Sequence, residues 1–113
     1  KSNYLVLERS WEAIAAAKSG VEGLSRSLAA SYAHLNIRSN VIAPGLVESK
    51  LAEPILRTEQ GRKHSCNMHA LKRLGQPQSI AKAIHWLLDS DNDWVTGEVI
   101  RIDGGLSTLK VKP

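Results

Sequence analysis

Lys18 is the residue whose position most directly raises a chemical question. It stands in a run of alanines near the start of the helical stretch AIAAAKSGVEGLSRSLAASYAHLN, residues 13–36. A lysine there is either a solvated surface side chain or one half of a catalytic pair, in which its positive charge favours the ionised form of a neighbouring acid. The identity of its partner therefore decides what Lys18 can do.

A second group of reactive residue types lies in HSCNMH, which contains His64, Cys66 and His69. Imidazole and thiolate are zinc ligands, but this spacing matches no standard four-ligand pattern and no second cluster follows it. We therefore predict no metal site and interpret the segment as part of a polar helix. Cys66 is the only cysteine, which excludes an internal disulfide and favours a reducing, cytoplasmic compartment.

The elements that position these residues begin with a long helix over 11–35. Apolar residues recur along it at spacings of three and four and form one stripe. The stripe consists of Ile14, Ala17, Val21, Leu24, Leu28, Tyr32 and Leu35. Asn36 stands where a left-handed residue would end the helix. The β-branched IRSNVIA, 37–43, is a predicted strand, and Pro44–Gly45 ends it.

The rest of the chain reads as a long connection, a helix and a strand. Residues 46–74 are mixed, with short helical pieces around 50–59 and 62–70, and long ordered connections are often functional lids. Pro77 opens a helix that reaches to about 89. GEVIRID, 97–103, is a predicted strand that stops at Gly104–Gly105, and NYLVLE, 3–8, is a possible first strand.

This alternation of strands and helices predicts an α/β fold. We expect a partial Rossmann-like, doubly wound unit: a short parallel sheet of two or three strands flanked by helices, in a single domain over 1–113. So small a sheet leaves both edges and one helix face uncovered in a monomer. We therefore expect a homo-oligomer, or a partner protein that covers these faces.

Composition excludes several classes of protein. The formal charge is +4 and the pI is about 9.5, but the lysines and arginines are scattered, so nucleic acid is not an expected partner. No apolar run approaches the ~18 residues of a membrane span. The apolar stretch near the N-terminus is too short for a signal peptide.

Four stretches together carry a resemblance to a known family. They are AAAKSGVEGLSRSLA, NIRSNVIAPGLVES, RLGQPQSIAKAIHWLLDSD and WVTGEVIRIDGG. In this order and spacing they resemble the C-terminal half of the short-chain dehydrogenase/reductase family, especially its 3-oxoacyl-carrier-protein reductase branch. The resemblance covers about residues 13–106, and NYLVLE and its flanks do not share it.

The resemblance implies a role for Lys18 and shows what is missing beside it. In the family, a tyrosine four residues before the lysine is the general acid/base, and the lysine lowers its pKa and holds the nicotinamide ribose. Lys18 matches that lysine, but Ile14 occupies the tyrosine position and cannot exchange a proton. Tyr4 precedes the helix, and Tyr32 lies roughly 21 Å along its axis from Lys18. The family's serine is also missing, because Ser10 is too near Ile14 and fits better as a helix cap.

The resemblance also implies part of a cofactor site. The family uses NAD or NADP, and its glycine-rich phosphate-binding turn has no counterpart in this sequence. Pro44 and Gly45 match the end of the strand beside the nicotinamide. The backbone near Val47 and the hydroxyl of Ser49, where the family usually has threonine, match the groups that face its carboxamide. We therefore expect no cofactor bound by these residues alone.

Two hypotheses about function follow. The first is a truncated family member that is catalytically inactive alone and acts as a self-associating or interaction module. The second is an NAD(P)-dependent ketoreductase that is active only when a partner supplies the nucleotide-binding half.

Two further groups of residues leave alternatives open. The basic residues of the connection either form a solvated face or receive an acidic carrier or a phosphorylated substrate. These residues are Arg57, Arg62, Lys63, Lys72 and Arg73. Trp86 and Trp94 are interpreted as core or interface anchors. In the family, the helix after Pro77 and the last strand form one dimer interface, and the long helix forms another.

Overall fold

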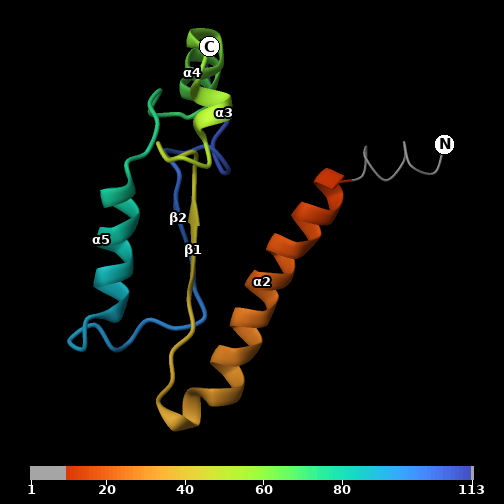
Figure 1. Ribbon diagram of the computed structural model, residues 1–113. Coiled ribbons are helices and arrows are strands. Elements are labelled where there is room, and N and C mark those ends of the chain that lie inside the picture. The colour runs from red at the N-terminus through yellow and green to blue at the C-terminus, as the bar shows by residue number, and fades with distance from the viewer. Residues whose placement is uncertain (1–9, 113) are drawn as a thin grey trace, which may run out of the picture. The chain divides into compact units, whose positions relative to one another are not determined.

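The computed structural model of the chain describes residues 10–112, and side chains from residue 14 onward. The predicted strand at 3–8 and Tyr4 lie outside the described residues, and so does the side chain of Ser10. The chain divides into two compact units. The first holds residues up to 41 together with 95–99, and the second holds residues 42–94 and those from 100 onward. Figure 1 shows the elements in chain order.

The long helix of the first unit is α2, Ser10–Tyr32, followed by the 3-10 helix η1, Ala33–Leu35. The combined helical stretch ends at Asn36. The φ of Asn36 is 60°, which is left-handed, and its N–H donates to the carbonyl of Ala33 at 2.9 Å. Asparagine tolerates this conformation better than most residues do. The predicted helix over 11–35 and its stop at Asn36 are therefore confirmed.

The buried face of α2 is made of small residues rather than the apolar stripe. Ser25 and Ala29 are buried, whereas every member of the stripe that begins at Ile14 is exposed. The hydroxyls of Ser25 and Ser39 lie 2.8 Å apart, and a Cβ on Gly97 would lie 3.9 Å from that of Ala29. Small side chains allow this close approach, so within its unit α2 packs through them and leaves the stripe free.

Two parallel strands form the sheet, β1, Val41–Pro44, and β2, Val99–Ile102. The N–H of Val41 donates to the carbonyl of Glu98, and that of Gly45 donates to the carbonyl of Ile102. From the first bond to the second, the donor moves forward along β1 and the acceptor moves forward along β2, which is the pattern of parallel strands. The predicted strands over 37–43 and 97–103 are confirmed with shorter bounds, and so is an α/β fold with a short parallel sheet.

The strand predicted over 37–43 begins only at Val41, because side chains bind the backbone of the residues before it. The amide of Asn40 donates to the carbonyl of Val95 at 2.9 Å and accepts from the N–H of Glu98 at 3.1 Å. The hydroxyl of Thr96 accepts from the N–H of Ser39 at 3.1 Å. Ahead of Val41 these side-chain bonds accompany the backbone bond from the N–H of Gly97 to the carbonyl of Ser39 at 2.8 Å.

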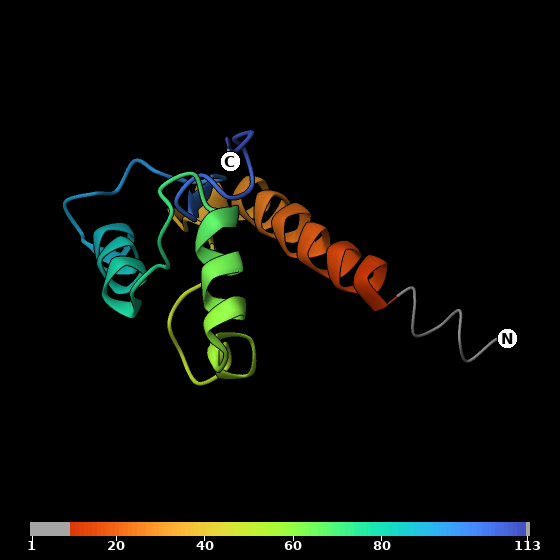
Figure 2. The same cartoon turned by 90° about the horizontal axis from the view of Figure 1, so that it is seen from above.

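The second unit carries three helices, α3, Glu53–Leu56, α4, Glu59–Met68, and α5, Pro77–Leu88. Figure 2 shows α4 and α5 as separate rods, and both views place α5 beside the strands. The break between α3 and α4 falls at Thr58, whose hydroxyl accepts from the N–H of Gly61 at 3.0 Å and so caps α4. The expected pieces at 50–59 and 62–70 are therefore present, with the boundary set by this cap.

The core of the second unit is small. Ala52, Leu56 and Leu74 are buried together, and Leu46 and Cys66 pack against them. The two tryptophans are not part of it, because Trp86 is 51% and Trp94 97% exposed. The interpretation of these tryptophans as core anchors is wrong for this chain, since the buried residue of α5 is Leu87.

Candidate functional site

The ends of the two strands meet at Gly45. A Cβ on Gly45 would lie 2.8 Å from the Cα of Asp103, closer than real Cβ atoms come to backbone. Gly104 and Gly105 follow with φ of 57° and 85°, in the left-handed region that favours glycine. The Pro-Gly and Asp-Gly-Gly motifs therefore form one junction at the carboxyl ends of the strands.

Asp103 closes the turn on its side of this junction. Its carboxylate accepts hydrogen bonds from the N–H groups of Gly105 at 3.0 Å and Ser107 at 3.1 Å, and from the hydroxyl of Ser107. The Ser107 hydroxyl bond, more than the backbone bonds, lowers the pKa of Asp103. The carboxylate therefore stabilises the turn in its ionised form.

Val47 presents a free donor and acceptor beyond the junction. The N–H of Glu48 donates to the carbonyl of Gly75 at 3.0 Å, and the N–H of Gly75 donates to the carbonyl of Leu46 at 2.9 Å. In such a parallel bridge the N–H and C=O of Val47 point away from Gly75. Neither group is hydrogen-bonded within the described part of the chain.

The hydroxyl of Ser49 serves a local structural role. It accepts from the N–H of Ala52 at 3.3 Å, which caps the turn into α3. The side chain is exposed, and its own O–H remains available as a donor. The hydroxyl therefore caps this turn and still leaves a donor two residues from Val47.

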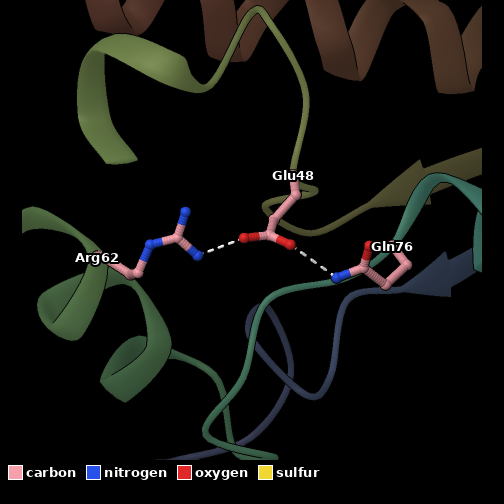
Figure 3. A network of polar contacts seen from close by, with 3 residues as sticks. All are labelled: Glu48, Arg62 and Gln76. Atoms are coloured by element: carbon pink, nitrogen blue, oxygen red, sulfur yellow. Dashed lines mark hydrogen bonds and ion pairs between the residues drawn. The ribbon is translucent and has the colours of Figure 1, made fainter. Parts of the chain in front are cut away.

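Glu48 joins three segments, as Figure 3 shows. One carboxylate oxygen accepts from the guanidinium of Arg62 on α4. The other accepts from the amide of Gln76, the residue before α5, at 2.8 Å. The hydrogen bonds from Arg62 and Gln76 and the charge of Arg62 lower the pKa of Glu48. The carboxylate is therefore held ionised between the two helices.

His69 is a structural histidine. It is 1% exposed, its Nδ1 lies 2.7 Å from the carbonyl oxygen of Ser65, and the N–H of Leu46 donates to its Nε2 at 3.2 Å. A carbonyl only accepts and an N–H only donates, so the ring is neutral with its proton on Nδ1. His69 therefore fixes the end of α4 to the segment after β1.

The segment HSCNMH lies at the end of the polar helix α4, as predicted, but part of it is buried. Ser65 and His69 are buried, and Cys66 packs against the core. Across residues 10–112, no three His, Cys, Asp or Glu side chains come together as a metal site would require. Both ring nitrogens of His69 already have protein partners.

The two residues that the resemblance matched to the family's catalytic pair lie on α2. Lys18 and Ile14 are both exposed and stand one turn apart on the same face of the helix. Tyr32 is the last residue of α2 and is 44% exposed. Lys18 and Ile14 belong to the first unit, whereas the residues from Pro44 to Ser49 belong to the second.

The basic residues of the connection are not equivalent. Arg62 pairs with Glu48, and the ammonium of Lys72 donates to the carbonyls of Asn67 at 3.0 Å and Lys112 at 2.8 Å. Arg57 and Arg62 line a hollow of about 320 Å³ with Glu48, Ser49 and other residues of the segment. Arg73 lines a separate pocket of about 240 Å³ with Arg101 at the strand ends.

The helices of the described region are also too short or too polar to cross a membrane.

Comparison with known proteins agrees with the resemblance found in the sequence. A family model described as "Enoyl-(Acyl carrier protein) reductase" matches residues 4–107. The match therefore begins before residue 13 and includes most of NYLVLE, so the expectation that this segment lies outside the resemblance is wrong. The 3-oxoacyl-[acyl-carrier-protein] reductase FabG of Thermotoga maritima is 39% identical over 92 residues, which are 81% of this chain and 37% of the relative.

Solved structures share the fold. A 4-hydroxyisoleucine dehydrogenase complexed with NADH superposes with a TM-score of 0.80 at 29% identity, covering 84% of this chain and 39% of that one. A short-chain type dehydrogenase/reductase from Mycobacterium ulcerans superposes with a TM-score of 0.74 at 30% identity, covering 79% and 32%. The chain thus spans 32% to 39% of the length of these proteins.

Proposed function

This chain belongs to the short-chain dehydrogenase/reductase family, and we propose that its 113 residues act by association with another chain rather than by catalysis alone. The observation that carries the proposal is Ile14, one turn before Lys18 on α2. Reduction of a carbonyl by hydride requires a proton donor at the carbonyl oxygen. Ile14 has no proton to give, so Lys18 has no acid to activate.

The exposed apolar side chains support the association. On α2 the stripe includes Val21, 56% exposed, and Leu24, 61% exposed. On α5 the residues Trp86 and Leu88 are 51% and 76% exposed, and Trp94 follows. Apolar surface of this extent gains free energy when a partner covers it. The partner is a second copy of the chain or another protein with a complementary apolar face.

Light scattering tests this association. The purified chain is expected to have the mass of a dimer or a larger species. Two double variants distinguish the two apolar faces. They are Leu24→Glu with Leu28→Glu on α2, and Trp86→Glu with Leu88→Glu on α5. At least one pair should yield the monomer, whereas Arg26→Glu, a control charge change on α2, should not. A wild-type chain that is monomeric throughout its soluble range contradicts self-association.

A second candidate function rests on Val47 and Ser49. The free N–H and C=O of Val47 and the hydroxyl of Ser49 complement a primary amide, which has one acceptor oxygen and two donor hydrogens. We propose that Pro44, Gly45, Val47 and Ser49 form the nicotinamide side of an NAD or NADP site. When bound, the cofactor would supply the hydride, and these residues would orient its ring.

This half-site needs a complement. These 113 residues contain no glycine-rich phosphate-binding turn, so a partner outside them would bind the pyrophosphate. With such a partner, which would also supply the acid missing at Ile14, the assembly would be a ketoreductase-type oxidoreductase. The related 4-hydroxyisoleucine dehydrogenase was solved with NADH, which supports a nicotinamide cofactor for the family.

A further inference from the structure

We infer that Glu48 is a positioning residue, which holds the segment from Val47 to Ser49 in place by joining it to α4 and to the start of α5. The inference deepens the proposed nicotinamide side, since the segment includes Val47 and Ser49, and it rests on that proposal for the function of these two residues.

The backbone alone holds this segment weakly. A single bridge pairs Val47 with Gly75, and only two backbone hydrogen bonds accompany it. One of them uses the N–H of Glu48, so the same residue is bound through its backbone and through both oxygens of its carboxylate. Because Glu48 lies between Val47 and Ser49, its three attachments restrain the backbone on both sides.

The carboxylate also joins two helices that the chain connects by a loop. Arg62 belongs to the second turn of α4, and Gln76 is the cap of α5. Figure 3 shows Glu48 between them, with its two oxygens pointing in opposite directions. Movement of α4 away from the start of α5 therefore breaks at least one bond to Glu48 and releases the segment that carries Val47.

Charge around Glu48 reinforces this role. The hollow beside it is lined by three cations, Lys50, Arg57 and Arg62, and by two carboxylates, Glu48 and Glu53. Removing the charge of Glu48 leaves the three cations facing one carboxylate. Their mutual repulsion then adds to the loss of the hydrogen bond from Gln76.

Amide hydrogen exchange tests the inference without a cofactor or partner. In Glu48→Gln, one oxygen can still accept from Arg62, but the new amide cannot accept from Gln76. We expect the N–H groups of Glu48 and Gly75 to exchange several-fold faster than in the wild type, with a smaller change in α4. Glu53→Gln removes the same charge from the same hollow but takes no bond from Gln76 or Arg62, and should change these rates much less.

A double variant makes the test specific. The variant Glu48→Gln with Gln76→Glu exchanges donor and acceptor in the hydrogen bond between these two residues, because the amide at 48 then donates to a carboxylate at 76. Protection at Gly75 should return toward the wild-type value. Equal exchange in Glu48→Gln and Glu53→Gln, or a double variant no better protected than the single one, overturns the inference.

The pH profile supplies a readout that a general packing role would not move. In the wild type, protection of Gly75 should fall once pH drops below the ordinary glutamate pKa of 4.5 toward the lowered value of Glu48. In Glu48→Gln this step should be absent. A step that persists in Glu48→Gln counts against the inference. Because these results need no nicotinamide, they stand even if the chain binds no dinucleotide.

Discussion

Gly45 and Asp103 are in backbone contact at the carboxyl ends of the two strands. The space that a Cβ on Gly45 would occupy is already filled by the Cα, Cβ and carbonyl oxygen of Asp103. This contact joins the Pro-Gly and Asp-Gly-Gly motifs, and it fixes where the segment from Leu46 to Ser49 begins. The proposed nicotinamide side therefore depends on a glycine whose role is purely steric.

Gly45→Ala tests this contact. Because backbone atoms must move to admit the new methyl group, we expect a loss of about 1–3 kcal/mol in the free energy of unfolding. Urea denaturation measures it. Gly20→Ala is the matched control, since nothing lies within 4 Å of its Cβ position in α2 and alanine should stabilise the helix by about 0.5–1 kcal/mol. Equal effects at both sites would refute the steric account.

His69→Ala should destabilise the second unit by roughly 2–4 kcal/mol, since it leaves a cavity and unpaired partners at Leu46 and Ser65. Thermal unfolding measures the loss, and His64→Ala on the exposed side of α4 should change stability by less than about 0.5 kcal/mol. Nitrogen-15 NMR of the wild type should show the Nδ1–H tautomer. An Nε2–H tautomer would contradict the assigned hydrogen bonds.

Asp103→Asn should alter the pH dependence of stability. The pKa of Asp103 is lowered in the folded chain, so its contribution is present above the ordinary value of 3.8 and is lost as pH falls through the lowered value. Denaturation midpoints across this range should therefore fall more steeply for the wild type than for Asp103→Asn. Ser107→Ala should flatten the wild-type curve in the same direction, because the Ser107 hydroxyl contributes most to the shift. Parallel curves for all three proteins would show that the turn does not depend on this carboxylate.

Ile14→Tyr restores the family's tyrosine one turn before Lys18. We expect the variant chain alone to show no ketone-dependent oxidation of NADPH, because the phosphate-binding turn is still missing. Absorbance of the reduced nicotinamide measures the reaction, with Ile14→Phe as the control of similar size. Turnover by Ile14→Tyr alone would show that the 113 residues bind the cofactor productively, contrary to the proposed function.

Local sequence signals predicted the elements well. Asn36 ends the long helix in a left-handed conformation, Pro77 opens α5, and the Pro-Gly and Asp-Gly-Gly motifs end the strands. Each of these residues acts through its own backbone preferences, which the sequence displays directly. The family relationship was predicted from four stretches of sequence, whose order and spacing resemble those of the family.

Long-range partners could not be predicted in this way. His69 is buried because Leu46 and Gly104 lie against it, and Glu48 has its role because Arg62 and Gln76 lie within reach. The residues next to His69 and Glu48 in the sequence do not indicate these contacts. The apolar stripe of α2 was predicted, but its exposure follows from the small residues Ser25 and Ala29, which form the packed face.

The most direct test of the central claim is a titration of the purified wild-type chain with NADH and NADPH, followed by nicotinamide fluorescence and by light scattering on the same samples. The account predicts a dimer or larger species and no saturable change in fluorescence, because Val47 and Ser49 lack a phosphate-binding partner. Saturable binding with micromolar affinity would contradict it. That result would mean that association of these chains rebuilds a complete dinucleotide site.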